Sequence, residues 1–275
     1  MNRIDATPPA WGACQPAGWK ACWLRLLHAL PTGAAWRRLA LWLRKPLKNA
    51  LGPWVDVEVW GLRLRLRGRG NLSEQRLIFM PQFLDAAERL AIAEALKDGG
   101  VFFDIGANAG VYALWVGSRR VAGTRIEAFE PDPDLCASLR FNLHTNGLDA
   151  VHLHATALGR EGGRVTLVSG AGNKGENRID ASPAAAGVTV DITTLPRFLA
   201  RAGIERIDAM KIDIEGHEPD VLEPLFAETP RTLWPRLLVC EVVHDAGNRL
   251  ATLLADNGYQ LAGQGRLNGI YRLQP

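Results

Sequence analysis

The chain has 275 residues, 47% of them hydrophobic, and 32 Lys and Arg against 29 Asp and Glu give a formal net charge of +3. This apolar content and nearly balanced charge exclude intrinsic disorder, and the length allows one large domain or two small ones. We expect no transmembrane segment and no signal peptide, because no apolar run is long enough and the start lacks the required pattern. The four cysteines are neither paired nor dense, which predicts reduced thiols in a cytoplasmic protein.

Residues 1–70 differ in composition from the rest of the chain. They contain 12 Lys and Arg against 3 Asp and Glu, and seven of the nine tryptophans. Residues 71–275 carry 20 basic and 26 acidic residues and are therefore net acidic. We interpret residues 1–70 as a basic, Trp-rich extension of a main domain that spans residues 71–275.

Two segments of this extension have apolar residues at helical spacing, residues 23–30 and 36–43, with basic residues beside the second. Pro31 and Pro46 are expected to bound these two short amphipathic helices. Such helices at 19–50 could contact the inner face of a membrane, with Trp at the headgroups and Arg and Lys on anionic lipid. Alternatively, they cap the main domain or shape its substrate entrance.

The next segment, residues 55–69, alternates apolar and charged residues around Gly61. This pattern predicts a β-hairpin with one apolar and one charged face. The row of arginines could hold an anionic substrate, but a solvated strand face is the simpler interpretation.

Beyond residue 85, strand-like and helix-like runs alternate, which indicates a parallel α/β sheet covered on both faces. Strands are expected at residues 101–105, 125–130, 151–158, 208–214, 236–243 and 259–262, and helices at residues 108–120, 133–146, 217–226 and 246–257. In such sheets ligands bind beyond the carboxyl ends of the strands. The residues at the strand ends are therefore the candidates for function.

A glycine-rich turn follows the first of these strands, where Gly106 and Gly110 flank Asn108. Glycine permits a tight turn and lets a ligand approach bare backbone. Twenty residues beyond Gly110 the second strand ends at Glu130, whose carboxylate can accept both hydroxyls of an adenosine ribose. Together these features predict a site for an adenosine-containing cofactor.

The identity of that cofactor depends on Asp104, which stands where a dinucleotide site has its first glycine. A carboxylate there is unfavourable beside a pyrophosphate, whereas it can face the ammonium group of S-adenosylmethionine. The sequence also lacks a GxxxxGK[ST] motif, so it has no P-loop. We therefore expect S-adenosylmethionine, with an NAD-dependent oxidoreductase as the alternative.

Several motifs together resemble the FkbM-type methyltransferases across about residues 98–245: FFDIGANAG, AFEPDP, NLHTNG, ATALG, MKIDIEGHE and CEVVH. The resemblance implies a Rossmann-like, seven-stranded, mostly parallel sheet with an antiparallel last strand, matching a short strand at residues 269–273. It also implies O-methylation of hydroxyls on sugars and natural products. Through the matching motifs it places Asn108 and Ala157 in the cofactor site, beside Asp104, Gly106, Gly110 and Glu130.

The densest group of ionisable residues lies at the end of the fourth main strand, where Lys211, Asp213 and Glu215 share one face. Charged side chains there are expected to line a cleft, since burying them without partners is costly. The fifth strand ends nearby with Glu241 and His244.

An alcohol needs a base for its proton during methyl transfer. We expect Asp213 or His244 to be that base, with Glu241 orienting one of them and Lys211 holding the substrate or pairing with Asp213. A second hypothesis is that Asp213, Glu215 and Glu241 bind a magnesium-like ion.

Residues 169–187, rich in small and polar residues, could form a lid over the substrate or a loose connection. We expect the acceptor to be a small molecule or glycan and not a nucleic acid, because the body is acidic and lacks the [ND]PP[YF] motif. A membrane-associated module without catalytic activity is the remaining alternative.

Overall fold

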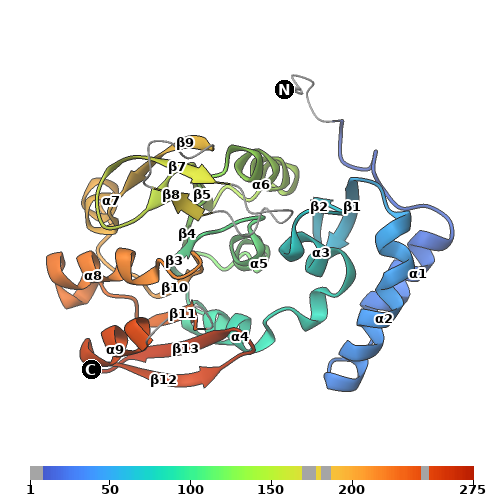
Figure 1. The fold of residues 1–275 in the computed structure, drawn as a ribbon. Coiled ribbons are helices and arrows are strands. Elements are labelled where there is room, and N and C mark those ends of the chain that lie inside the picture. Colours follow the sequence, from blue (N-terminus) through green and yellow to red (C-terminus); the bar gives the residue numbers. More distant parts are fainter. Residues whose placement is uncertain (1–8, 169–177, 181–186, 243–247) are drawn as a thin grey trace.

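The computed structural model describes residues 9–168, 178–180, 187–242 and 248–275. Its centre is a seven-stranded sheet in the order β12-β13-β11-β10-β3-β4-β5 (Figure 1). The strands are β3 (Gly100–Ile105), β4 (Thr124–Phe129), β5 (Val151–His154), β10 (Ala209–Ile212), β11 (Leu237–Glu241), β12 (Tyr259–Gln264) and β13 (Asn268–Leu273). Neighbouring strands from β11 to β5 are parallel, and β13 is antiparallel to both β11 and β12. The predicted mostly parallel, seven-stranded, Rossmann-like sheet is thus confirmed.

Helices cover both faces of this sheet (Figure 1). On one side lie α4 (Ala86–Ala95), α5 (Val111–Ser118) and α6 (Pro133–Asn146), and on the other α7 (Leu195–Ala202), α8 (Glu218–Glu228) and α9 (Arg249–Asp256), with the short 3-10 helix η3 (Arg231–Leu233) after α8. Successive residues of a strand point to opposite faces, so Phe102 packs in the cluster with α5 while Phe103 packs in the cluster with α7 and α8. Burial on both faces explains why these strands are almost continuously apolar.

A second, four-stranded sheet in the order β6-β9-β7-β8 follows β5. Its strands are β6 (Ala157–Leu158), β7 (Gly163–Val168), β8 (Arg178–Asp180) and β9 (Val188–Thr193). The single strand predicted at residues 151–158 was wrong, because the chain leaves the main sheet after His154 and β6 pairs with β9 instead.

The N-terminal layer, residues 19–83, contains α1 (Trp19–His28), α2 (Ala34–Ala50), β1 (Trp54–Val59), β2 (Leu62–Arg67), α3 (Leu72–Phe79) and the 3-10 helix η1 (Pro81–Phe83). In Figure 1 α1 and α2 lie beyond the hairpin and α3, away from the central sheet. Leu27 and Leu47 are fully buried and belong to the same hydrophobic cluster as the hairpin, α3 and α5. The division of the chain at residue 70 stays a prediction, and this cluster continues across it.

Two predictions for this layer were wrong in detail. Pro46 lies inside α2 and does not end it. The proline is exposed, so water can reach the backbone carbonyl that loses its helical hydrogen bond to the proline nitrogen. The next residue, Leu47, is buried and anchors the last turn of the helix. The charged face of the hairpin is solvated only in part, at Glu58 and Arg63, which are exposed. Asp56 and Arg65 are buried there as an ion pair, and the Arg65 guanidinium lies 4.7 Å from the Phe141 ring of α6.

None of the described helices is both long enough and apolar enough to cross a membrane. None of the four cysteines, all of which lie within the described residues, forms a disulfide.

Candidate active site

The glycine-rich turn links β3 to α5 at the point in the sheet where the strand order reverses. From β3 the chain crosses to β4 on one side, while β10 pairs with β3 on the other side. Gly106 has a φ of +75°, and a Cβ atom there would overlap the main-chain oxygen of Asp213. Only glycine fits this position, so the turn of β3 lies directly against the end of β10.

Asp104 lies near the carboxyl end of β3 and is buried. Its carboxylate accepts a hydrogen bond from Ala113 N at 2.9 Å, in the first turn of α5. Burial raises the pKa of Asp104 to about 7, and the nearby charge of Lys211 opposes this rise. Among the described residues no cation contacts this carboxyl directly, so a ligand cation would be favoured beside it.

Glu130 follows β4 and is also buried. Oε1 accepts a hydrogen bond from Asp132 N at 2.8 Å, and Oε2 accepts one from Asn108 N at 2.7 Å. Burial raises the pKa of Glu130 to about 7, against the effect of these two backbone donors. A carboxylate has about four acceptor positions, so two remain for the hydroxyls of a ribose.

Of the remaining predicted cofactor residues, Asn108 contacts the Glu130 carboxyl group directly. Asn108 has a left-handed φ of 53°, which turns its N–H toward Glu130. Gly110 precedes α5, and a Cβ atom there would overlap the side chain of Leu139. Ala157 begins β6, three residues beyond His154, whose carbonyl accepts the Glu130 N–H. The structure thus brings Asn108 to Glu130, while Ala157 lies on the segment that leaves the neighbouring strand.

Asn71, the residue before α3, contacts this turn and was missed by the sequence interpretation. Its Nδ2 donates to Asn108 Oδ1 at 2.6 Å, and its Oδ1 accepts from Glu74 N, which caps α3. An Asn directly before a helical segment is an N-cap signal, so the cap was predictable from sequence. The contact with the glycine-rich turn was not.

Lys211 and Asp213 form an ion pair at the end of β10, with Nζ and Oδ2 3.0 Å apart. Lys211 is opposite Asp104 in the parallel register, and its side chain is 1% exposed. Burial opposes the charge of Lys211, but Asp213 outweighs burial and raises the pKa of the lysine. The prediction that Lys211 lines an open cleft was therefore wrong, since Asp213, 42% exposed, is the partner that reaches the surface.

Tyr112 and Asp85 extend this cluster toward the N-terminal layer. The Tyr112 hydroxyl donates to Asp85 Oδ2 at 3.1 Å, and its ring centre lies 5.7 Å from Lys211 Nζ. Asp85 precedes α4 with a left-handed φ of 41°, an unusual conformation for a residue other than glycine. The sequence interpretation named neither residue, because the link between them spans two elements.

The predicted magnesium site is not supported. Glu215, in a left-handed turn (φ 56°), and Glu241, at the end of β11, stand on different elements near Asp213. The residues that the structure describes contain no group of three or more His, Cys, Asp or Glu side chains that could hold a metal ion. His244, the alternative base, and most of the predicted lid at residues 169–187 lie outside the described residues.

These residues fit S-adenosylmethionine. The bare Gly106 backbone gives close access at the end of β3. One buried carboxyl group at each side of the turn matches the two polar ends of the cofactor, Asp104 for the ammonium group and Glu130 for the ribose.

Comparisons with known proteins agree with this geometry. A Methyltransferase FkbM domain model matches residues 104–261, from Asp104 to the middle of β12. "Methyltransferase 1" of Beauveria bassiana is 27% identical over 189 residues, which cover 60% of this chain and 74% of that protein. The "31-O-demethyl-FK506 methyltransferase FkbM" of Streptomyces tacrolimicus is 27% identical over 216 residues, which cover 67% of this chain and 80% of that protein.

Among solved structures, a methyltransferase from Geobacter sulfurreducens is similar at 17% identity and a TM-score of 0.41, covering 89% of this chain and 93% of its own. The family model covers more than half of the sequence and includes the glycine-rich turn, Glu130 and the Lys211–Asp213 pair. The chain therefore belongs to the FkbM family of S-adenosylmethionine-dependent methyltransferases.

Proposed function

We propose that this methyltransferase methylates a hydroxyl group of a sugar, a glycan or another small natural product, and that Asp213 accepts the hydroxyl proton. The observation that carries the proposal is the environment of Asp213. Its carboxylate is partly exposed and is held by a buried lysine, and its main chain lies against Gly106 of the glycine-rich turn. A substrate hydroxyl can reach such a group, while the ion pair fixes its position.

S-adenosylmethionine, when bound, supplies an electrophilic methyl group on a sulfonium centre. The residues of this chain then bind, orient and remove a proton. Glu130 would hold the ribose hydroxyls and Asp104 the ammonium group, which fixes the methyl group relative to the end of β10. Asp213 would orient the acceptor hydroxyl in line with the methyl group and take its proton as the new C–O bond forms and the bond between the methyl carbon and sulfur breaks, with S-adenosylhomocysteine as the leaving group.

Lys211 acts in this scheme as a positioning residue. It is buried behind Asp213, and its Nζ also donates to Ile212 O at 3.2 Å. Its ammonium group, 3.0 Å from Oδ2, would hold the Asp213 side chain in place at the end of β10. We propose that Glu241, at the end of the adjacent β11, orients the base.

One relative supports an oxygen acceptor. The Streptomyces tacrolimicus protein is named as a 31-O-demethyl-FK506 methyltransferase, a name that indicates an oxygen as its acceptor atom. The same type of acceptor in this chain is part of the proposal, and it agrees with a carboxylate base at the strand ends.

The test uses methyl-labelled S-adenosylmethionine and fractionated hydroxylated metabolites of the host. We expect label in an ether-linked methyl group, and Asp213→Asn to lower kcat by about 10²–10⁴-fold because the proton has no acceptor. Asp149→Asn, at an exposed loop position, is the matched control and should be fully active. Near-normal turnover by Asp213→Asn would remove Asp213 as the base.

We further propose that α1 and α2 contact an anionic membrane surface. Trp19, Trp36 and Trp42 are 54%, 43% and 65% exposed, and the basic side chains of Arg38, Lys45 and Lys48 are exposed along α2. Exposed tryptophans beside basic residues are typical of interfacial helices. The full-length double variant Trp36→Ser/Trp42→Ser should float less with phosphatidylglycerol vesicles, while Leu90→Ser, at an exposed position of α4, should float normally. Equal flotation of both would disprove membrane contact.

A further inference from the structure

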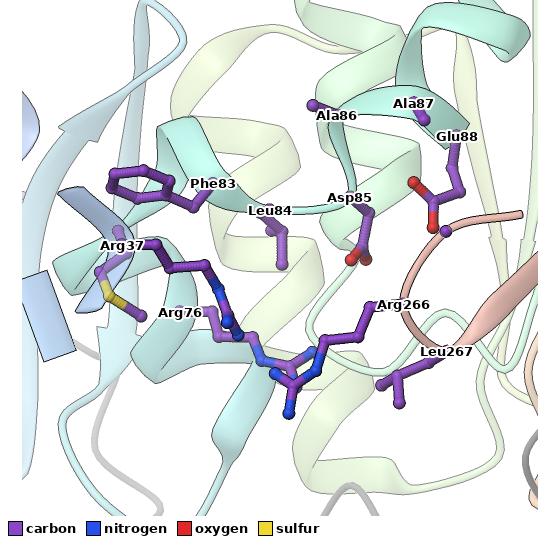
Figure 2. Close-up of a pocket in the computed structure, with 12 residues that line it drawn as sticks. Arg37, Arg76, Phe83, Leu84, Asp85, Ala86, Ala87, Glu88, Arg266 and Leu267 are labelled. Atoms are coloured by element: carbon purple, nitrogen blue, oxygen red, sulfur yellow. The ribbon is translucent and has the colours of Figure 1, made fainter. Parts of the chain in front are cut away.

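A cavity of about 370 Å³ lies between the N-terminal layer and the carboxyl edge of the central sheet (Figure 2). Its walls come from α2, α3, η1, the start of α4 and the turn between β12 and β13. A volume of this size is within the range of small-molecule binding sites. The family assignment and the proposed cofactor contacts leave this cavity without a role.

Three arginines dominate the cavity: Arg37 from α2, Arg76 from α3 and Arg266 from the β12–β13 turn. Figure 2 shows their side chains pointing toward one another from three different elements. In the part of the chain that the structure describes, none of the three forms an ion pair or a side-chain hydrogen bond. Burial, then the charges of Arg266 and Arg76, lower the pKa of Arg37. Gathered guanidinium groups repel one another, and a bound anion relieves that repulsion.

The two acids that line the cavity offset the charge of these arginines only in part, since Asp85 raises the pKa of Arg37 but does not outweigh burial and the two other arginines. Asp85 accepts the Tyr112 hydroxyl, and Glu88, which is buried, accepts a hydrogen bond from Asn268 Nδ2 at 3.3 Å. Neither carboxylate forms an ion pair within the described residues. The cavity therefore keeps an excess of positive charge on its arginine side.

The cavity borders the proposed methyl-transfer site at two places. Its lining residue Leu267 accepts a backbone hydrogen bond from Val242, the residue after Glu241. On the other side Asp85 leads through Tyr112 to Lys211 and Asp213. A molecule anchored at the arginines could thus present another of its groups at the ends of β10 and β11.

We infer that Arg37, Arg76 and Arg266 bind a phosphoryl group of the methyl acceptor, so that the acceptor is a phosphate ester that also carries a free hydroxyl. The inference rests on the proposed function. A phosphoryl group carries up to two negative charges and three terminal oxygens, and guanidinium groups bind such oxygens in pairs. The arginines select and hold the acceptor, whereas Asp213 acts on its hydroxyl.

The test measures binding of glucose 1-phosphate, glucose and inorganic phosphate to the full-length protein by calorimetry with S-adenosylhomocysteine present. We expect glucose 1-phosphate to bind, inorganic phosphate to compete with it, and glucose alone to bind at least about tenfold more weakly. Arg76→Gln and Arg266→Gln should each weaken glucose 1-phosphate binding about tenfold or more, because each removes a charged hydrogen-bond donor. Arg38→Gln, the neighbour of Arg37 at an exposed position of α2, is the matched control and should bind normally.

A parallel measurement uses vesicles of phosphatidylcholine with phosphatidylinositol, a phosphate ester held in a membrane. Arginine-dependent binding of glucose 1-phosphate supports a soluble acceptor, and arginine-dependent binding of the vesicles alone supports a lipid-held acceptor. Binding of neither probe, or equal weakening of glucose 1-phosphate binding by Arg38→Gln, would overturn the phosphoryl site.

Failure of this inference is separable from failure of the proposed function. The arginine variants should bind S-adenosylhomocysteine as the unmodified protein does, and Asp213→Asn should bind glucose 1-phosphate normally while losing methyl transfer. Full activity of Asp213→Asn would remove the proposed base and leave the phosphoryl site standing.

Discussion

Two groups of charged residues, one in the β1–β2 hairpin and one at the carboxyl edge of the central sheet, differ in how many hydrogen bonds and ion pairs their carboxylates form. In the hairpin, Asp56 accepts two hydrogen bonds from the Arg65 guanidinium and two more from the backbone N–H groups of Gly12 and Cys14. At the carboxyl edge of the sheet, Asp104 accepts one hydrogen bond among the described residues. Its neighbour Asp213 has one oxygen on Lys211 and is partly exposed.

The pKa directions of the two groups follow this difference. Burial would raise the pKa of Asp56, but Arg65, Cys14 and Gly12 outweigh it and the pKa is lowered. Burial prevails for Asp104 and Glu130, whose pKa values are both raised to about 7. A buried charge with all its partners holds the fold together, whereas an incompletely satisfied one is available for a ligand.

The largest effect on stability is expected in the hairpin. Asp56→Ala leaves the buried Arg65 without its partner, which should cost about 3–5 kcal/mol of unfolding free energy. Urea denaturation measures this loss, and the affinity for S-adenosylhomocysteine in the folded protein should stay unchanged. A loss below about 1 kcal/mol would contradict the structural role of the pair.

The next effect concerns the cofactor. Glu130→Gln loses the charge that accepts ribose hydroxyls, so the Kd for S-adenosylhomocysteine should rise about 10–100-fold. Glu127→Gln, on the same strand, is the matched control, since Glu127 pairs with Arg125 and His154. Calorimetry should show weak binding only for Glu130→Gln, and equal affinities would remove Glu130 from the cofactor site.

The two groups also predict opposite dependences on pH. The raised pKa values of Asp104 and Glu130 make their stability contribution complete below about pH 4 and lost as the pH rises through about 7. Each should lower the unfolding free energy of the cofactor-free protein by about 1.4 kcal/mol per pH unit in that window. Asp56, with its lowered pKa, loses its contribution as the pH falls. Denaturation of Asp104→Asn across this window should show a flatter pH profile, and an unchanged profile would contradict the assignment.

The smallest effect is expected where charges are paired on the surface. Arg160 bridges Asp220 and Glu223 with about half of its side chain exposed. Water and salt screen such pairs, so Arg160→Ala should change the unfolding free energy by less than about 1 kcal/mol. A larger loss of unfolding free energy, measured by thermal denaturation, would show that the exposure of an ion pair does not predict its contribution to stability.

The cofactor half of the site was predictable because its signals are local. Gly106 and Glu130 end consecutive strands, and a parallel sheet brings such ends to one edge. The bounds of α6 matched the prediction fully, since Asp132 caps it, Pro133 begins it and Gly147 ends it in a left-handed conformation.

The other buried residues of the site and the hairpin depend on contacts between segments far apart in the sequence, and the spacing of apolar residues does not predict such contacts. Arg65 belongs to a plain alternating strand, and only the packing of residues 9–14 and α6 over it makes it buried. Lys211 similarly looks exposed in sequence but lies beneath Tyr112. The four-stranded sheet was missed in part because its strands are short and pair with one another instead of extending the main sheet.

The arginine cavity has an evolutionary consequence. Two of its three cationic walls come from α2 and α3, before residue 80, whereas the cofactor loops come from residues 104–132. Under the proposed phosphoryl site, two of the three anchoring arginines are thus encoded before the cofactor loops, and Arg266 is encoded after them. Recombination upstream of β3 between homologues would then exchange Arg37 and Arg76 while leaving the cofactor loops intact.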